Sequence, residues 1–221
     1  MISVTGIGWI NTEEYGCILK GIEESYKDSV LPKKKIFPFS YKNIGRLDNV
    51  SRMTCAAVAL ALKDAGIECS PERKHDAGII STNASGSYET DMLYFRDYLD
   101  SGRTLSRGNL FIYTLPSSPS GEAAIYFGLQ GPLLYITGNN STMVNALMTA
   151  AEMVHDKEAP VMLAGMAQED RAIYFLLKGD SNKVGDGLCS YEDAVNVLEK
   201  DVGVNEMVHK FLNLRKGITV S

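Results

Sequence analysis

The residues best placed to do chemistry lie in the run Gly138-Asn139-Asn140-Ser141, which follows an apolar segment and precedes an alanine-rich one. This pattern predicts a buried strand, a tight turn and a buried helix. The first residues of such a helix offer free backbone N–H groups and the positive end of the helix dipole, which favour negative charge. Enzymes often place a nucleophile there, because the position lowers the pKa of a thiol and can stabilise an oxyanion. This turn contains two asparagines and a serine, and no cysteine.

The two asparagines can be interpreted in two ways. The amides of Asn139 and Asn140 could donate hydrogen bonds to a carbonyl or carboxylate of a ligand, or asparagine could simply cap the helix and tolerate a left-handed turn. Both roles can coexist, so both remain open. Ser141 would need a general base to act as a nucleophile, and its surroundings lack the Gly-x-Ser-x-Gly pattern of serine hydrolases.

None of the three histidines is expected to serve as that base. His155 lies near the far end of the same predicted helix, roughly 20 Å from Ser141 at about 1.5 Å per residue. His75 leads into a predicted strand at the end opposite to its functional, carboxyl end, and His209 falls in a predicted tail helix. We expect ordinary surface roles for all three, and we predict no catalytic residue.

Other motifs for cofactors or metals are absent or incomplete. Gly6-Ile7-Gly8 follows the first predicted strand but lacks the third glycine of a dinucleotide-binding loop, so close packing explains it better. The four cysteines are widely separated, without a Cys-x-x-Cys pair or a nearby histidine cluster. We therefore expect reduced thiols, no disulfide framework, no metal site and no cofactor.

The overall composition narrows the range of partners. The chain has 221 residues, 45% of them hydrophobic and 22% charged, with a formal net charge of −5. This composition supports a full core and gives no reason to expect nucleic acid or an anionic membrane as a partner. No apolar run approaches the roughly 18 residues of a membrane span, and residues 1–4 lead directly into a strand-like run without a signal peptide. We expect a cytoplasmic protein.

The elements that position the turn follow from the hydrophobic pattern. Strands are predicted at residues 2–9, 76–82, 160–165 and 172–177 and in the apolar run before the turn; helices are predicted at 15–24, 51–65, 88–99, 121–129, 141–155, 190–200 and 205–215. About six residues, 166–171, separate the last two strands, whereas a parallel crossover needs about a dozen, so the final strand should be antiparallel. The order predicts an α/β fold with helices on both faces of the sheet. We expect one domain over residues 1–221, with a core at 1–178 and a helical tail at 179–221.

Two further predictions concern a helix cap and an irregular segment. Ser51 should cap the helix at 51–65, which begins after it in the sequence pattern. Residues 27–41 are predicted to be irregular, and they contain the run Lys33-Lys34-Lys35. This run could bind an acidic partner, but a solvated loop is the interpretation that we favour.

Several segments together resemble the β-ketoacyl-ACP synthases. Residues 45–67 are similar to the first long helix of that family, and residues 86–99 fit the helical segment that follows. Residues 115–125 resemble the connector and helix that precede the family's nucleophile, and Gly128-Leu129-Gln130-Gly131-Pro132 is the most specific part. The likeness covers roughly residues 1–178. It implies the N-terminal half of the thiolase-like fold, a five-stranded mixed sheet whose last strand is antiparallel.

The resemblance also implies what this chain lacks. Counted from Gly131-Pro132, the position of the family's catalytic cysteine falls on Asn140, which cannot be acylated in that role. The family's two active-site histidines belong to a C-terminal half for which this sequence has no counterpart. The resemblance therefore implies fold and pathway without condensing activity, with Asn140 at a vacated nucleophile position and Asn139 and Ser141 as possible pocket residues. Chain-length-factor subunits of type II polyketide systems also replace the cysteine and act beside an active ketosynthase.

The function that follows is a non-catalytic, chain-length-factor-like partner subunit in fatty-acid or polyketide-type biosynthesis. It would form a homo-oligomer, or a hetero-oligomer with a full-length ketosynthase, and could contact acyl carrier protein. One alternative is a small-acyl-ligand binder, or a residual acyl-transfer or hydrolase enzyme, that uses Asn139-Asn140-Ser141; another is one piece of a split synthase. The helix at 141–155 is apolar on more than one side, so we expect the tail or another subunit to cover it.

Overall fold

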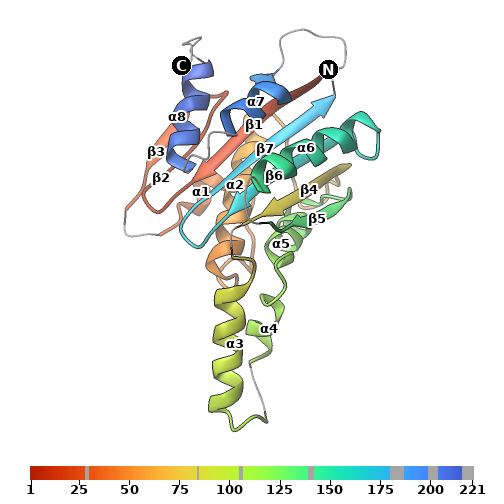
Figure 1. Cartoon of the computed structure of the whole chain (residues 1–221). Helices are drawn as coiled ribbons and strands as arrows, with labels where there is room; N and C mark the ends of the chain where they lie inside the picture. Colours follow the sequence, from red (N-terminus) through yellow and green to blue (C-terminus); the bar gives the residue numbers. More distant parts are fainter. Residues whose placement is uncertain are drawn as a thin grey trace.

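A mixed sheet runs through the centre of the computed structural model, which describes residues 1–27, 30–83, 85–104, 107–138, 142–179, 187–198 and 204–215. Its strands are β1 (Ile2–Ile10), β2 (Glu14–Cys17), β3 (Ile22–Ser25), β4 (Ala77–Thr82), β5 (Leu133–Ile136), β6 (Val161–Ala167), β7 (Ala172–Gly179) and β8 (Cys189–Ser190). They follow the order β3-β2-β1-β7-β6-β4-β5, and β8 also pairs with β1 (Figure 1).

Strand direction agrees with the expectation from loop length. β4 is parallel to both β5 and β6, whereas β7 is antiparallel to β6 and to β1. The five predicted strands are β1, β4, β5, β6 and β7, and the antiparallel direction of the last is confirmed. β2, β3 and β8 extend the sheet beyond the prediction.

Helices pack on both faces of this sheet (Figure 1). The helices of the described ranges are α1 (Lys33–Ile36), α2 (Asn49–Asp64), α3 (Tyr88–Asp100), α4 (Gly108–Ile112), α5 (Ser118–Phe127), α6 (Thr142–His155), α7 (Tyr191–Leu198) and α8 (Val204–Arg215), and of these α3 and α4 lie away from the sheet. Side chains alternate along the strands, so Ile79 joins a core cluster with α2 and α5, while Ile80 joins one with α6, α7 and α8. The predicted α/β class is confirmed.

One predicted helix, at residues 15–24, is wrong. This segment forms the hairpin of β2 and β3, and β2 pairs along β1. Gly21, in the turn, has a φ of +61°, which a glycine adopts without strain. The segment's two glycines weaken its helix propensity, so pairing with β1 decides its structure.

The start of α2 also differs from the prediction. The cap is Asp48, whose carboxylate accepts a hydrogen bond from the backbone N–H of Ser51 at 2.8 Å. Ser51 lies inside the helix and is buried. Asp48 competes better for the cap because its side chain reaches the third residue beyond it. Nearby, residues 27–41 were predicted to be irregular, but they include the short helix α1.

The far end of α2 is anchored by Asp64, which is only 5% exposed. Its carboxylate accepts hydrogen bonds from the backbone N–H groups of Ile7, Leu19 and Lys20, at 2.9, 3.0 and 2.8 Å. β1 approaches α2 so closely that a Cβ at Gly8 would collide with the helix backbone. The close-packing interpretation of Gly6-Ile7-Gly8 is thereby confirmed.

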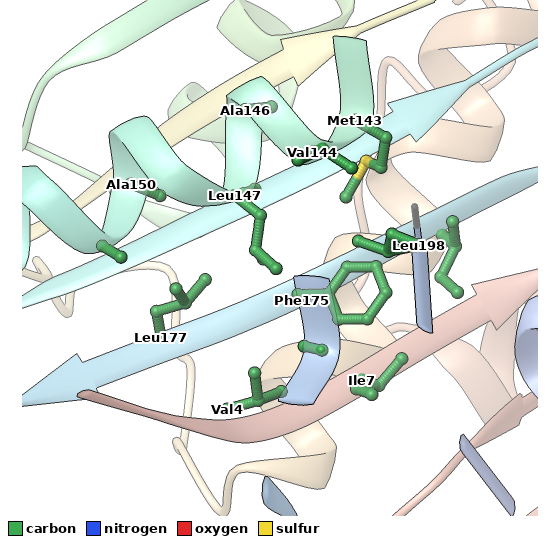
Figure 2. Close-up of a cluster of buried hydrophobic side chains, with 14 of the residues drawn as sticks. Val4, Ile7, Met143, Val144, Ala146, Leu147, Ala150, Phe175, Leu177 and Leu198 are labelled. Atoms are coloured by element: carbon green, nitrogen blue, oxygen red, sulfur yellow. The ribbon is translucent and has the colours of Figure 1, made fainter. Parts of the chain in front are cut away.

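The helices of the tail, α7 and α8, cover the sheet next to α6. Figure 2 shows Val4, Phe175 and Leu198 gathered with the α6 side chains in one cluster. Phe211 of α8 packs edge-to-face on Phe175, with ring centroids 5.1 Å apart. The tail therefore supplies cover for this apolar face, one of the two possibilities expected from the sequence.

Among the described residues, two surfaces stand out for their exposed apolar side chains. β5 is the last strand in the sheet order, and its Leu133 and Leu134 are each 37% exposed. We call α3 and α4 together the arm, because they project away from the sheet (Figure 1). Neither helix of the arm has a buried residue. Its large exposed apolar residues are Tyr88, Leu93, Phe95, Leu99, Phe111 and Ile112.

Candidate functional site

The site predicted from the sequence begins where β5 ends. Asn139, Asn140 and Ser141 lie outside the described residues. The structure places both flanks of this turn, since β5 ends at Ile136 and α6 begins at Thr142. The predicted strand before it and the predicted helix after it are thereby confirmed.

The carboxyl ends of three parallel strands meet beside this turn. Thr82, at the end of β4, is in register with Ile136 of β5 and Met166 of β6. In open α/β sheets, ligands bind beyond the carboxyl ends of parallel strands. We call these strand ends and the start of α6 the strand-end site.

Thr82 supplies a buried polar group at this site. It is 2% exposed, and its Oγ1 has no hydrogen-bond partner among the described residues. Because side chains alternate along a strand, Thr82 faces the same side as Ile80, which packs in the cluster that contains α6. A buried hydroxyl without a partner is costly, so this atom is suited to meet a polar group. Thr82 was not among the site residues predicted from the sequence, although its place at the end of an apolar strand was a signal.

The other side of β4 carries a closed hydrogen-bond network. The Ser81 hydroxyl lies 2.5 Å from the Tyr174 hydroxyl and accepts a hydrogen bond from Ser120 at 2.6 Å. All three residues are buried. Burial raises the pKa of Tyr174 to about 12, although its hydrogen bond with Ser81 acts in the opposite direction. The Tyr174 phenol therefore stays protonated near pH 7, and the network joins β4, β7 and α5.

Asn83 follows Thr82 and organises the loop after β4. Its Oδ1 accepts hydrogen bonds from the backbone N–H groups of Ser85 and Gly86 and from the Tyr135 hydroxyl, the last at 2.7 Å. Its Nδ2 donates to the Gly86 carbonyl at 3.1 Å. Burial raises the pKa of Tyr135, which keeps the phenol protonated as the donor. Asn83 therefore positions the loop and the end of β5.

The histidines lie as predicted in two cases out of three. His155 is at the carboxyl end of α6, its side chain 80% exposed and 2.8 Å from the Asp156 carboxylate, and His209 is exposed on α8. His75 departs from the predicted surface role, because its Nε2 is buried without a hydrogen-bond partner among the described residues. It precedes β4 and forms a bridge with Leu129, at the opposite end of β4 from Thr82.

The described residues offer little other reactive chemistry. They contain no group of three or more His, Cys, Asp or Glu residues that could hold a metal ion. The cysteines are free, and burial raises the pKa of Cys17 and Cys189 to about 12, which makes them poor nucleophiles. No helix in the described ranges has both the length and the apolar character needed to cross a bilayer.

Comparison with known proteins agrees with this geometry. Residues 18–173 match the family model for the β-ketoacyl synthase N-terminal domain. Nodulation protein E of Rhizobium leguminosarum bv. trifolii is 27% identical over 124 residues, which are 56% of this chain and 31% of that protein. Putative polyketide beta-ketoacyl synthase 2 of Streptomyces virginiae is 24% identical over 125 residues, 57% of this chain and 31% of that protein. The chain thus spans about a third of the length of these curated relatives.

Solved structures share the fold. The ishigamide ketosynthase/chain length factor aligns with a TM-score of 0.61 at 14% identity, over 82% of this chain and 63% of that chain. A β-ketoacyl synthase from Burkholderia phymatum STM815 aligns with a TM-score of 0.56 at 16% identity, over 81% of this chain and 59% of that chain. The AntDE:AntF structure contains a type II polyketide acyl carrier protein in complex with its ketosynthase. It aligns with a TM-score of 0.55 at 14% identity, over 80% of this chain and 58% of that chain. At such identities the likeness concerns the fold alone.

Proposed function

Because the chain belongs to the β-ketoacyl synthase N-terminal domain family, we propose that it is a non-catalytic, chain-length-factor-like partner subunit in fatty-acid or polyketide-type biosynthesis. The observation that carries the proposal is Asn140, which stands where the spacing from Gly131-Pro132 would place the family's cysteine. An amide side chain is not among the groups that enzymes use as acyl-accepting nucleophiles. Buried Cys17 and partly buried Cys189 are poor substitutes, because desolvation raises the pKa of both thiols.

A partner subunit is supported by the two surfaces with exposed apolar side chains. An edge strand with exposed apolar side chains, such as β5, is a template for pairing with another chain. The arm presents several large apolar residues and has no buried residue of its own. Exposed apolar patches of this kind mark interaction surfaces. We propose that a second copy of this chain or a full-length ketosynthase covers both surfaces.

Acyl carrier protein is a further proposed partner. The AntDE:AntF structure holds an acyl carrier protein in complex with its ketosynthase, and one chain of that structure shares the fold described for this chain. The support is therefore one of analogy between folds.

The proposal is tested by acylation followed by intact mass spectrometry. After incubation with an acyl-CoA, the natural protein is expected to remain unmodified. The Asn140→Cys variant is expected to gain one acyl group, because a thiol at the start of a helix has a lowered pKa. Asn139→Cys is the matched control and is expected to stay largely unmodified. Absence of an adduct on Asn140→Cys would contradict the assignment of this position.

A second candidate is the acyl-ligand binder or residual acyl-transfer or hydrolase enzyme that uses Asn139-Asn140-Ser141. The unpartnered Thr82 hydroxyl favours it, because it places a buried polar group at the strand-end site. The same measurement distinguishes the residual enzyme from the non-catalytic subunit. An acyl adduct on the natural protein that disappears in Ser141→Ala would support the enzyme and overturn the non-catalytic proposal.

A further inference from the structure

A hollow rimmed by lysines lies beside the carboxyl end of α2. Its volume is about 650 Å³, within the range of small-molecule sites. The lysines on its lining are Lys20, Lys34, Lys35 and Lys63. None of its lining residues belongs to the strand-end site.

The walls between these lysines are apolar. Ile36 and Phe37 approach from α1 and the residue after it, Leu62 from α2, and Phe127 from the end of α5. Each of these four side chains is no more than 8% exposed, so their positions are set by core packing. The hollow therefore combines a fixed apolar wall with a charged rim.

The positive charge of the rim is only partly neutralised. Lys35 pairs with Glu24 at 2.7 Å, and Glu68 also lies on the lining. Lys20, Lys34 and Lys63 form no ion pair within the described part of the chain. The carboxylate of Asp64, next to Lys63, accepts hydrogen bonds from three backbone N–H groups and attracts Lys20 only at longer range, as Glu24 does Lys63.

This excess of positive charge is local, because the whole chain carries a formal net charge of −5. Three ammonium groups without ion pairs suit a group with more than one negative charge, and lysine binds phosphate as a point charge. The apolar wall suits an alkyl or aromatic body on the same molecule.

We infer that this hollow binds a phosphorylated small molecule with an apolar body. The phosphate lies among Lys20, Lys34 and Lys63, and the apolar body packs on Pro38 and Ile67, two apolar lining residues that keep accessible surface beside the buried wall. This inference does not depend on the proposed function, because it uses neither the turn at Asn140 nor the surfaces proposed for a partner.

The test is a calorimetric titration of the full chain with octyl phosphate and octanoate below their critical micelle concentrations, octanol below its solubility limit, and inorganic phosphate. Octyl phosphate is expected to bind at least about tenfold more tightly than each of the other three, because it alone has both features of the site. Equal affinity for octanoate would overturn the assignment to phosphate. Equal affinity for octanol would overturn the role of the lysines.

Variants locate the binding. The double variant Lys34→Gln, Lys63→Gln is expected to lose at least about tenfold in affinity for octyl phosphate. Lys178→Gln, an exposed lysine on β7 outside the lining, is the matched control and should bind like the natural protein. Far-UV circular dichroism checks that both variants fold. An equal loss in the control, or no loss in the double variant, would overturn the inference.

Discussion

At the scale of single residues, Asp64 connects three segments of the chain. Its buried carboxylate accepts hydrogen bonds from β1, through Ile7, and from the loop after β2, through Leu19 and Lys20. Each buried donor that loses its acceptor costs about 1–3 kcal/mol. Asp64→Ala is therefore expected to lower the free energy of unfolding by about 3 kcal/mol or more, measured by urea denaturation.

Asp64→Asn provides the graded control for this prediction. The asparagine keeps one carbonyl oxygen in place of two carboxylate oxygens, so it can satisfy only part of the cluster. The free energy of unfolding of Asp64→Asn should lie between those of the natural protein and the alanine variant. An alanine variant as stable as the natural protein would contradict the anchoring role of this carboxylate.

The burial of His75 leads us to predict that the stability of the folded protein depends on pH. Burial, aided by the Arg73 guanidinium, lowers the pKa of His75 below its ordinary value of 6.5. The folded protein then binds this proton less tightly than the unfolded chain, so stability falls as the pH drops through 6.5 towards the folded pKa. Urea midpoints at about pH 7.5 and 5.5 should show this fall, and His75→Gln should reduce it. The same dependence in the variant would assign the effect to other groups.

Residue types predicted some parts of the site better than others. The glycine and asparagines at 138–140 marked a turn because few other residues favour such conformations, and the structure has a strand before it and a helix after it. Thr82 went unnoticed because an unpartnered hydroxyl is a property of the packed structure. Capping by Asp48 in place of Ser51 was missed because both residue types suit the position.

At the scale of elements, α8 tests whether the tail is part of the core. Phe211 is fully buried and packs on Phe175 of β7. Phe211→Ala is expected to lower the free energy of unfolding by about 3–5 kcal/mol, because it removes a large buried side chain and leaves a cavity. The fluorescence of the single tryptophan, Trp9, which lies in the same cluster, reports the transition.

Leu212→Ala is the matched control, since Leu212 is only partly buried against the same cluster. Its effect should be clearly smaller than that of Phe211→Ala. Similar small effects for both would mean that α8 detaches from the sheet at little cost, and that the cover over this face is dispensable.

Element prediction succeeded where burial on both faces leaves a simple pattern. β4, β6 and β7 are almost continuously buried, and their apolar runs are visible without any knowledge of neighbours. The hairpin of β2 and β3 failed for the opposite reason. Its conformation depends on pairing with β1, and local propensity contains no information on that pairing.

At the scale of the whole molecule, the arm predicts association. Leu93 and Phe95 are 51% and 53% exposed on α3, so replacing both by serine removes apolar surface without opening a cavity. The free energy of unfolding of this double variant should differ from that of the natural protein by no more than about 0.5 kcal/mol. Sedimentation velocity should show weaker association, either with a second copy or with a full-length ketosynthase.

A double variant on a polar part of α3, Glu89→Ser with Asp91→Ser, is the control and should associate like the natural protein. Unchanged association of the apolar variant would exclude the arm from the interface. A parallel substitution at the sheet edge, Leu134→Lys, tests β5 separately, since a charged residue opposes pairing along an edge strand.

The pairing of β1 with β7 has a consequence for the time course of synthesis. Thr5 of β1 donates a hydrogen bond to the carbonyl of Leu176, 171 positions along the chain. A ribosome adds about 5–20 residues per second, so β1 waits on the order of ten seconds or more for its central neighbour. β1 can pair with β2 soon after translation, but its other edge stays open until β7 is made, and its apolar side chains need protection in that interval.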